Sequence, residues 1–446
     1  MTRDSKTGRE RGQKERLQIW LDGLAGLLFG ASFLWGLFLY GAAEIQTSYQ
    51  LFLLLLAPVL IALWGLCLGN HQTRFLLLLA LGFFLLLQIF QQETLAGRGY
   101  VILALGWMAL FFTLTFTSKS VTASRNMAIF LILVGSIEAL YGLVQSLGGI
   151  DYIGDYYRGL GSQASGTLIN KNHFAGLLNM TIPVAIGALF ASFSFRRSKV
   201  RLHSEVYAWV WILLLSCSLM GLAVLLSRSR GGAVILLGSL ILVALMLSSK
   251  KRKHRSESLS SLAVWILIIT SLGLSSWVGL DALLGRFDSL DVDMSTRTAI
   301  YRASLPLIGE NYWAGVGPGM YQWMFRPYQV EATGTLYKHA HNDYLQSAAE
   351  WGIPAALVFW GFVLWRLRQA ARTFFQSKDR WRQGIALGCV GAIFSILLHS
   401  FIDFNLQIPS NWMIFNIVLG LSWSIEEDNA LSSKLSGRMT WRSRNS

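Results

Sequence analysis

The sequence predicts an all-α membrane protein that crosses the bilayer about twelve times. Of its 446 residues, 53% are apolar and only 14% are charged, whereas a soluble domain has about 25% charged residues. Apolar runs of about 18 residues or more recur along the chain, and each can cross a hydrocarbon core of about 30 Å. Most of the surface should face lipid, because it carries too few charges to face water.

Each apolar run is a predicted membrane-spanning helix. The basic segment before the first run shows no signal-peptide cleavage pattern, so the first helix is expected to act as an uncleaved anchor. The predicted spans are residues 22–40, 51–68, 75–91, 100–117, 127–147, 174–195, 206–226, 231–248, 262–280, 346–365, 383–402 and 409–425.

The lysines and arginines orient these spans. If the N-terminus is cytoplasmic, 28 of the 38 Lys and Arg lie in cytoplasmic segments, as the positive-inside rule predicts. The basic runs 196–199 and 250–253 are the strongest anchors of this orientation. The formal net charge of +14 therefore reflects membrane orientation, and we expect no nucleic-acid partner.

The chain then divides into five parts, and the third is the most suited to chemistry. It is an outside loop of 65 residues, far longer than most connections between helices, and long loops tend to be functional. The polar ends, 1–18 and 426–446, are predicted to be disordered. The parts are a cytoplasmic basic tail at 1–21, transmembrane helices at 22–280, the loop at 281–345, three further transmembrane helices at 346–425 and a cytoplasmic tail at 426–446.

Ten cations remain on the outer side, where topology does not require them. Most fall in or beside three segments, residues 151–173, 227–231 and 281–345. The ten are Arg98, Arg158, Lys171, Arg228, Arg230, Arg286, Arg297, Arg302, Arg326 and Lys338.

The first segment with chemical potential runs from residue 166 to 176 and enters a predicted span. It places Asn170, Lys171 and Asn172 at a helix N-terminus, where backbone N–H groups and the helix dipole favour an anion. Capping of the helix by Asn170 or Asn172 is an equally good explanation.

The second segment, residues 227–232, is a very short turn between two long apolar spans. Its two arginines, Arg228 and Arg230, are costly this close to the hydrocarbon unless they are paired or functional. Arginine binds phosphate through two parallel hydrogen bonds, and Gly231 and Gly232 allow a ligand to approach closely. Snorkelling of the arginines to the headgroup level is the alternative.

The third segment, residues 338–352, contains two histidines. A histidine can take a proton near neutral pH, as a general base must do with a substrate hydroxyl. A metal site formed by His339 and His341 is less favoured, because the spacing is atypical and no second cluster of His or Cys is present. Glu350 could pair with an arginine, orient a histidine or be a satisfied buried acid.

Other polar or reactive residues carry less information. The acidic group Asp288, Asp291 and Asp293 is explained equally well as polar surface. The three cysteines lie inside apolar runs without CxxC spacing and are expected to be core residues.

Together the three segments resemble the O-antigen ligase and O-antigen polymerase superfamily of bacterial envelope proteins. The pair His341 and Asn342, followed by Gly352, looks like the superfamily signature, and the segments 166–176 and 227–232 are similar to its companion motifs. Their order, their shared side of the membrane and the span count extend the resemblance over nearly the whole chain. Ala355 departs from the ligase pattern, which favours polymerisation of another exopolysaccharide over ligation to lipid A-core.

The resemblance implies a GT-C-like glycosyltransferase in the bacterial inner membrane, with both termini in the cytoplasm and the long loop in the periplasm. Such enzymes transfer a glycan from an undecaprenyl-diphosphate carrier to an acceptor hydroxyl. The acceptor is lipid A-core in ligases, a growing glycan in polymerases and a protein Ser or Thr in O-oligosaccharyltransferases. The partners expected are therefore the lipid-linked donor, the acceptor and membrane lipid, with no cofactor and no metal.

Residue by residue, the resemblance assigns the general base to His341 and the diphosphate clamps to Arg230 and Arg297, with Arg228 as a further candidate. The physical chemistry agrees, because a diphosphate leaving group gains negative charge that guanidinium groups stabilise. A single attack by the activated hydroxyl would invert the anomeric centre. Five further residues are expected to support the site: Asn342, His339, Glu350, Asn172 and Lys171.

A transporter or flippase of lipid-linked sugars is the main alternative, because it would also need arginines on the outer side. A transporter should place ionisable residues near the bilayer midplane, and Glu138 is the clearest acid within a span. No inverted repeat with broken helices is visible in the sequence, which favours the enzyme.

Overall fold

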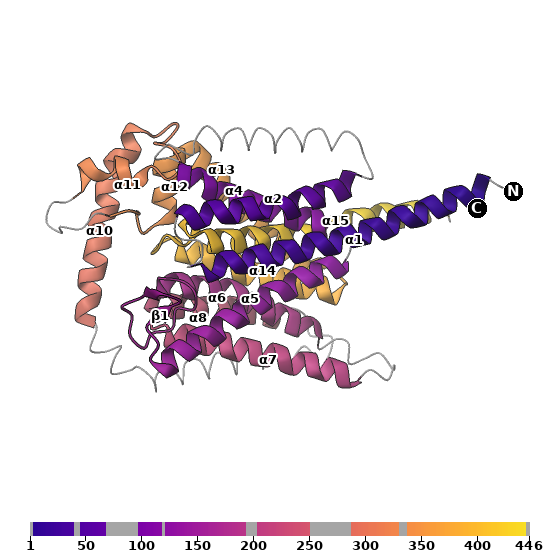
Figure 1. The fold of residues 1–446 in the computed structure, drawn as a ribbon, viewed down its shortest axis with the longest axis horizontal. Helices are drawn as coiled ribbons and strands as arrows, with labels where there is room; N and C mark the ends of the chain where they lie inside the picture. The colour runs from indigo at the N-terminus through magenta and orange to yellow at the C-terminus, as the bar shows by residue number, and fades with distance from the viewer. Residues whose placement is uncertain are drawn as a thin grey trace.

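The computed structural model is a bundle of helices with a smaller polar unit across one end (Figure 1). It describes residues 3–39, 45–67, 97–117, 121–192, 203–249, 287–329 and 337–442. Both termini project from one end of the bundle, and we call the opposite end, where α10 lies, the outer end. The bundle helices are α1 (Arg3–Phe38), α2 (Ile45–Cys67), α4 (Gly97–Thr117), α5 (Val121–Gly148), α6 (Lys171–Ser192), α7 (His203–Leu226), α8 (Arg230–Ser249), α13 (Ile353–Gln376), α14 (Arg380–His399) and α15 (Pro409–Arg442).

Six of the described helices are long and apolar enough to cross a membrane: α1, α5, α6, α7, α8 and α14. Two more apolar stretches are shorter, Gln50–Val59 in α2 and Gly99–Leu114 in α4. The predicted spans 75–91 and 262–280 lie outside the described residues, so a total of about twelve stays a prediction. The multi-pass character is clear from the six long helices alone.

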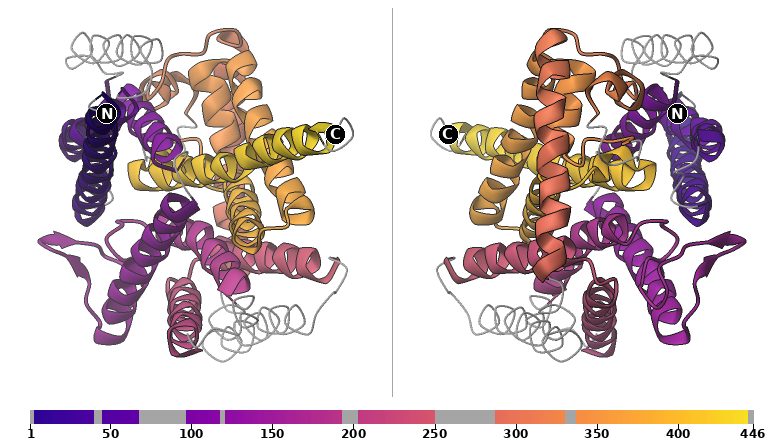
Figure 2. Two further views of the ribbon diagram at one scale, coloured as in Figure 1. Left: turned by 90° about the vertical axis from the view of Figure 1, so that its right-hand side faces the viewer. Right: turned by 90° about the vertical axis from the view of Figure 1, so that its left-hand side faces the viewer.

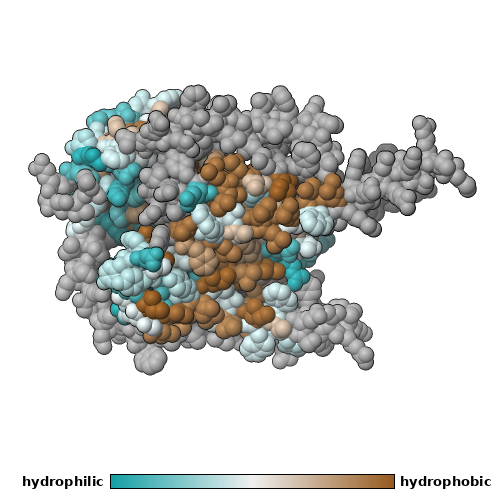
Figure 3. Space-filling model, viewed as in Figure 1, coloured by the Kyte–Doolittle hydropathy of each residue, from teal (hydrophilic) through white to brown (hydrophobic). Residues whose placement is uncertain are grey.

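The outward faces of the bundle carry large apolar side chains. Leu140 of α5, Val234 of α8 and Leu357 of α13 remain 55%, 69% and 68% exposed. Hydrophobic residues gather over the middle of the bundle, and hydrophilic residues gather at the outer end (Figure 3). Such an apolar band is the surface that lipid covers in a membrane protein.

Helix α6 lies at the centre of the bundle, since the whole of its apolar stretch is buried. It packs mainly on α14, and two glycines allow the backbones to touch. A Cβ atom on Gly187 would lie 2.0 Å from the Gly384 carbonyl oxygen, and one on Gly384 would lie 2.2 Å from the Gly187 oxygen. Close backbone approach is how membrane helices gain packing energy. Because α6 begins and α14 ends at the outer end, the packing of these two helices also brings Asn179 of α6 to His399 at the end of α14, 3.0 Å apart.

The smaller elements form the outer unit, which is the described part of residues 287–352. Helix α10 crosses the outer end of the bundle (Figure 2), and the predicted loop 281–345 therefore contains regular structure. A second hydrophobic core holds the unit together: Ile300, Leu307, Ile308, Tyr321, Phe325, Ala340 and Ala349. Its elements are α10 (Phe287–Glu310), α11 (Tyr321–Met324), η3 (Arg326–Tyr328) and α12 (Asp343–Trp351).

The predicted span 346–365 differs from the structure, which ends α12 at Trp351 and begins α13 at Ile353. Gly352 has a φ of +80°, which an L side chain rarely adopts, and Pro354 follows in the first turn of α13. Proline fits a first helical turn but cannot continue a helix from the preceding residues. The chain therefore breaks here, and α12 belongs to the outer unit.

The prediction of disordered ends is wrong for the described residues. Helix α1 begins at Arg3 and α15 continues to Arg442, so both polar ends continue helices of the bundle (Figure 1). Once an apolar helix has formed, each residue added to its end gains a hydrogen bond without the cost of starting a new helix. Composition alone does not reveal this extension of the helix.

Substitution of Gly384 should test the central crossing. Gly384→Ala puts a Cβ into the Gly187 carbonyl oxygen, and overpacking of this kind costs about 1–3 kcal/mol. We expect a lower midpoint of thermal unfolding in detergent. Gly361→Ala is the matched control, because nothing lies within 4 Å of a Cβ at Gly361 in α13. Equal midpoints for the two variants would contradict the crossing.

Candidate active site

The site is built around the outer end of α14. A helix leaves its last carbonyl groups without partners inside the helix. Here the N–H groups of residues 400–403 donate to the Ile396, Leu398 and His399 carbonyl oxygens, and the outer unit supplies donors for Leu397 and for the carbonyl groups that follow the helix. We call residues 400–404, which follow α14, the α14 corner. Tyr344 donates to the Leu397 carbonyl oxygen (2.7 Å), and the Asp343 N–H donates to that of Ser400 (2.9 Å). Tyr301 (3.0 Å) and Asn342 (3.2 Å) both donate to the Phe401 carbonyl oxygen. Arg297 donates to the carbonyl oxygen of Ile402.

His341 lies directly before α12, and its backbone is held on both sides. Its φ of +50° is in the left-handed region, which is uncommon for a residue other than glycine. The Tyr301 hydroxyl donates to the His341 carbonyl oxygen at 2.8 Å. The next residue, Asn342, caps α12 by accepting from the Leu345 N–H at 3.0 Å. The imidazole is therefore aimed by fixed backbone at the α14 corner.

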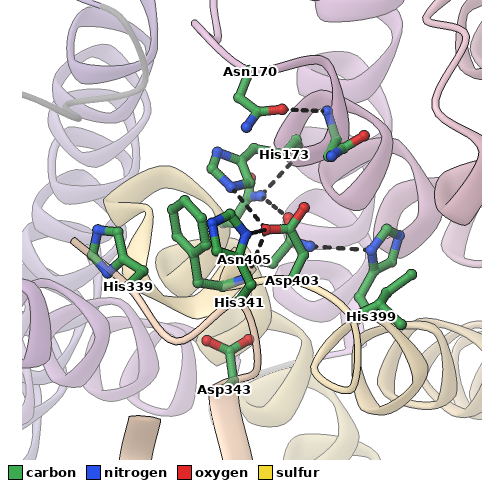
Figure 4. A network of polar contacts seen from close by, with 12 residues as sticks. Asn170, His173, His339, His341, Asp343, His399, Asp403 and Asn405 are labelled. Carbon is green, nitrogen blue, oxygen red and sulfur yellow. Dashed lines mark hydrogen bonds and ion pairs between the residues drawn. The ribbon is translucent and has the colours of Figure 1, made fainter. Parts of the chain in front are cut away.

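Asp403 in the α14 corner contacts two histidines through one oxygen (Figure 4). Its Oδ1 atom lies 3.6 Å from His341 Nδ1 and 3.7 Å from His173 Nε2. These distances are too long for ordinary hydrogen bonds, so they are polar contacts that can tighten when a substrate is bound. The His341 side chain is 30% exposed while its Nδ1 atom is buried, so the exposed part of the side chain is away from Nδ1.

The pKa values of two buried carboxyl groups at this end are shifted in opposite directions. Burial by itself would raise the pKa of Asp403, but the hydrogen-bonding contacts and charge of His173 and His341 hold that pKa well below its usual range. Burial raises the pKa of Asp343 well above its usual range, although the Leu406 N–H and the Ser400 hydroxyl both donate to it. The ionised carboxylate of the site is therefore Asp403. Pairs of acids whose pKa values are pushed apart are typical of catalytic sites.

The ring of Phe404 holds three imidazoles in place. His339 stacks on it with centroids 4.2 Å apart, and His173 and His341 meet its ring at steep angles with centroids at 4.7 and 4.8 Å. His339 lies apart from Asp403 in Figure 4. The two histidines that contact Asp403 are therefore distinguished by geometry from the third.

A buried polar network forms the floor of the site. Asn405, in the short helix η5 (Asn405–Gln407), contacts His399 Nδ1 at 3.1 Å, and Asn179 of α6 contacts His399 Nε2 at 3.0 Å. Asn411 donates to both the Asn405 side chain and the His173 carbonyl oxygen at 2.9 Å. These bonds tie α6, η5, α14 and α15 together beneath the site, although the Asn179 and Asn411 side-chain oxygens are buried without a hydrogen-bond partner among the described residues.

The arginines predicted from the sequence approach the same corner. The guanidinium group of Arg297 donates to the Ile402 carbonyl oxygen, next to Asp403. Arg230 is the first residue of α8, and a Cβ on its neighbour Gly231 would lie 2.6 Å from the Ile402 side chain. The structure therefore brings the 227–232 turn, Arg297 and His341 to one end of the bundle.

The α6 segment also reaches this turn. Asn170 accepts from the Asn172 N–H at 2.8 Å, so Asn170 is the residue that caps the helix. The Asn172 side chain accepts instead from the Ser229 hydroxyl at 2.8 Å, which ties the turn to α6, and Lys171 lies in the same helical turn. Arg228 is more exposed, with a φ of +52°, and points to the Ser162 hydroxyl at 3.4 Å.

Glu350 and His339 are joined through Gln346. The Gln346 side chain contacts His339 Nδ1 at 3.1 Å and donates to Glu350 at 3.0 Å. The other Glu350 oxygen accepts from the Gly319 N–H at 2.9 Å. Burial raises the pKa of Glu350 to about 7. Its described contacts are with the outer unit and not with His341. Of the three alternatives for Glu350, they favour a buried acid whose hydrogen bonds are satisfied.

Sequence reasoning missed Asp403, His173 and Tyr301. Asp403 is the only acid in the outside turn 403–408, and an acid at the exact end of a span was a usable signal. His173 stood inside the α6 motif but had no visible partner. Tyr301 acts through its hydroxyl on two backbone carbonyl groups, a role that leaves no pattern in a sequence.

The fold and the site define a class: a multi-pass helical membrane protein with a buried carboxylate–histidine pair at one end of the bundle. A family model described as O-antigen ligase matches residues 215–360. This match confirms the resemblance to the O-antigen ligase and polymerase superfamily. It covers Arg228, Arg230, Arg297 and His341, and it does not reach the start of α6 or Asp403. A search of curated proteins finds no match.

The raised pKa of Glu350 predicts a pH-dependent stability. Between pH 4.5 and about 7 the folded state keeps a proton that the unfolded state has lost, so stability falls as the pH rises through this window. The full effect is at most about 3 kcal/mol. Glu350→Gln should remove it, so the midpoint of thermal unfolding of the variant should rise relative to wild type from pH 5 to 7.5. Glu310→Gln, at an exposed carboxyl of α10, is the control. Parallel curves for wild type and Glu350→Gln would contradict this prediction.

Proposed function

We propose that the protein is a membrane glycosyltransferase of the ligase and polymerase type, which moves a glycan from an undecaprenyl-diphosphate carrier to an acceptor hydroxyl at the periplasmic face. The observation that carries the proposal is the contact between Asp403 and the buried Nδ1 of His341, with the rest of that ring partly exposed. The family match agrees with an enzyme of this kind.

In the proposed reaction, Asp403 accepts from the Nδ1–H of His341 and so leaves Nε2 without a proton. Nε2 takes the proton of the acceptor hydroxyl as that oxygen bonds to the anomeric carbon, and the bond from that carbon to the diphosphate breaks. Asp403 then stabilises the imidazolium, as the acid does in a Ser-His-Asp triad. One displacement inverts the anomeric centre.

The leaving diphosphate gains negative charge in this step. Arg230 and Arg297, with Arg228 further out, are proposed to hold it, because guanidinium groups stabilise charge strongly in a partly dehydrated site. The first turn of α6, with Lys171 and Asn172, adds the positive end of a helix dipole. The acceptor is a glycan, a lipid A-core or a protein hydroxyl, and Ala355 favours the growing glycan of a polymerase.

The contacts of Glu138 argue against the transport alternative. Its carboxyl group accepts from the N–H and the hydroxyl of Thr167 at 2.9 and 2.8 Å. This acid therefore holds the loop before α6 and is not presented to a pathway through the bilayer. A transporter would need an ionisable group in such a pathway.

Removal of the proposed base should abolish transfer. His341→Ala is expected to reduce glycan transfer by about 10²–10⁴-fold, measured with lipid-linked glycan in membranes at matched protein levels. His339→Ala should lose less, because His339 contacts Gln346 and Phe404 instead of Asp403. Wild-type transfer by the His341 variant would end the general-base proposal.

Replacement of Arg230 by lysine should separate charge from geometry. Lysine keeps the charge but loses the two-pronged contact with phosphate, so Arg230→Lys should lose about 10²–10³ in rate. Arg302→Lys, at an exposed arginine of α10, is the matched control and should keep wild-type activity. Full activity of Arg230→Lys would favour snorkelling at the headgroup level.

A further inference from the structure

His173 shares the carboxylate of the site with the proposed base, although it comes from a different helix. It lies in the first turn of α6, is 4% exposed, and its Nε2 atom faces Asp403 Oδ1 at 3.7 Å. His341 faces the same oxygen from the outer unit at 3.6 Å. Both facing nitrogens are buried, and neither makes a hydrogen bond within the part of the chain that the structure describes. The carboxylate therefore lies between two imidazoles that are 168 positions apart.

The chemistry of this arrangement favours one placement of the protons. An ionised carboxylate can only accept hydrogen bonds, so it favours the tautomer of each neutral ring that carries its hydrogen on the facing nitrogen. In that form His173 can donate from Nε2 and His341 from Nδ1 once the contacts shorten from 3.7 and 3.6 Å. The Phe404 N–H also donates to Oδ1 at 2.9 Å. For His341 the consequence is a free Nε2, the form that a general base needs.

We infer that His173 is a positioning residue, which donates from Nε2 to Asp403 and so keeps the carboxylate turned toward His341 Nδ1. The inference rests on the proposed function, because it assigns His173 a part in the same proton transfer. His173 does not touch the reacting atoms and acts only through Asp403. The Asn411 side chain donates to the His173 backbone carbonyl oxygen, and the His173 ring packs at a steep angle against Phe404, so the imidazole has little freedom to move.

Two substitutions separate donation from packing. His173→Gln keeps an N–H close to the position of Nε2, whereas His173→Phe keeps an aromatic ring against Phe404 and removes the donor. With purified protein in nanodiscs and undecaprenyl-diphosphate-linked glycan as donor, kcat should fall at least about tenfold for His173→Phe and the KM for the donor should stay unchanged. His173→Gln should recover most of kcat. Wild-type kcat for His173→Phe, or an equal loss in both variants, would overturn the inference.

A double variant tests whether His173 acts through Asp403. If it does, adding His173→Phe to Asp403→Asn should cost less than about twofold more, whereas an independent structural role would add its full loss. Each variant must first match wild type in gel filtration and in its thermal midpoint. His173→Gln keeps the test open if the Phe variant fails to fold.

A spectroscopic readout needs no glycan. Solid-state ¹⁵N NMR of histidine-labelled protein in bilayers distinguishes a protonated ring nitrogen from a bare one, and His341→Gln identifies the His341 signals among the seven histidines. Wild type and His173→Gln should show His341 with the hydrogen on Nδ1, and His173→Phe should show a mixture of tautomers. An unchanged His341 spectrum in His173→Phe would overturn the inference. Unimpaired transfer by His341→Ala would instead overturn the proposed function and leave the NMR result standing.

Discussion

A helix that ends inside a protein leaves carbonyl groups that must find donors, because a buried polar group without a partner costs about 1–3 kcal/mol. At the end of α14 the chain that follows the helix supplies some of these donors, and another part of the chain supplies those for the Leu397, Ser400, Phe401 and Ile402 carbonyl groups. Tyr344, Asp343, Tyr301, Asn342 and Arg297 of the outer unit all donate to the last carbonyl groups of α14 or to the corner that follows it. The same bonds that satisfy the helix end therefore dock the outer unit on the bundle.

This docking also sets the distance on which the chemistry depends. His341 lies in the outer unit, and Asp403 lies in the α14 corner. Tyr301 joins the two directly, because its one hydroxyl contacts both the His341 and the Phe401 carbonyl oxygens, at 2.8 and 3.0 Å. A side chain held by such supporting contacts stays close to its working geometry, whereas one on an unsupported loop does not. The left-handed backbone of His341 is a local strain that these contacts offset.

Local patterns in the sequence predict those parts of the fold that depend on local physics. Hydropathy predicts the long helices because each crosses an apolar layer by itself, and the charge bias agrees with two termini at one end. The motifs single out His341, Arg297 and the 227–232 turn. The structure places all three at one corner, although no local rule requires it. The break at Gly352 is visible only if Pro354 is given more weight than the apolar run.

Local patterns in the sequence do not predict the pairing of Asp403 with His173 and His341. It depends on the α6–α14 crossing and on the docking of the outer unit, and both are contacts between distant segments. A buried carboxylate is acceptable only when it is paired, so Asp403 in an apolar context signals that partners exist. It does not say which of the seven histidines they are. That information lies in the packing of α6 on α14 and in the docking of the outer unit, which one sequence does not express.

The depth at which Asp403 and His341 should lie relative to the bilayer follows from the two proposed substrates. A polyprenyl diphosphate keeps its phosphates at the headgroup level while its tail stays in lipid, and the acceptor hydroxyl arrives from water. A base for this reaction has to lie where the apolar band ends, and His341 does so, directly beyond the end of α14. Below it the amides of Asn179, Asn405 and Asn411 are bonded to His399 or to one another. These bonds join α6, α14, η5 and α15 beneath His341, so the residues proposed to act on the substrates lie at one end of the bundle. That asymmetry suits an enzyme acting on one face of a membrane and does not suit a transporter, which must open to both.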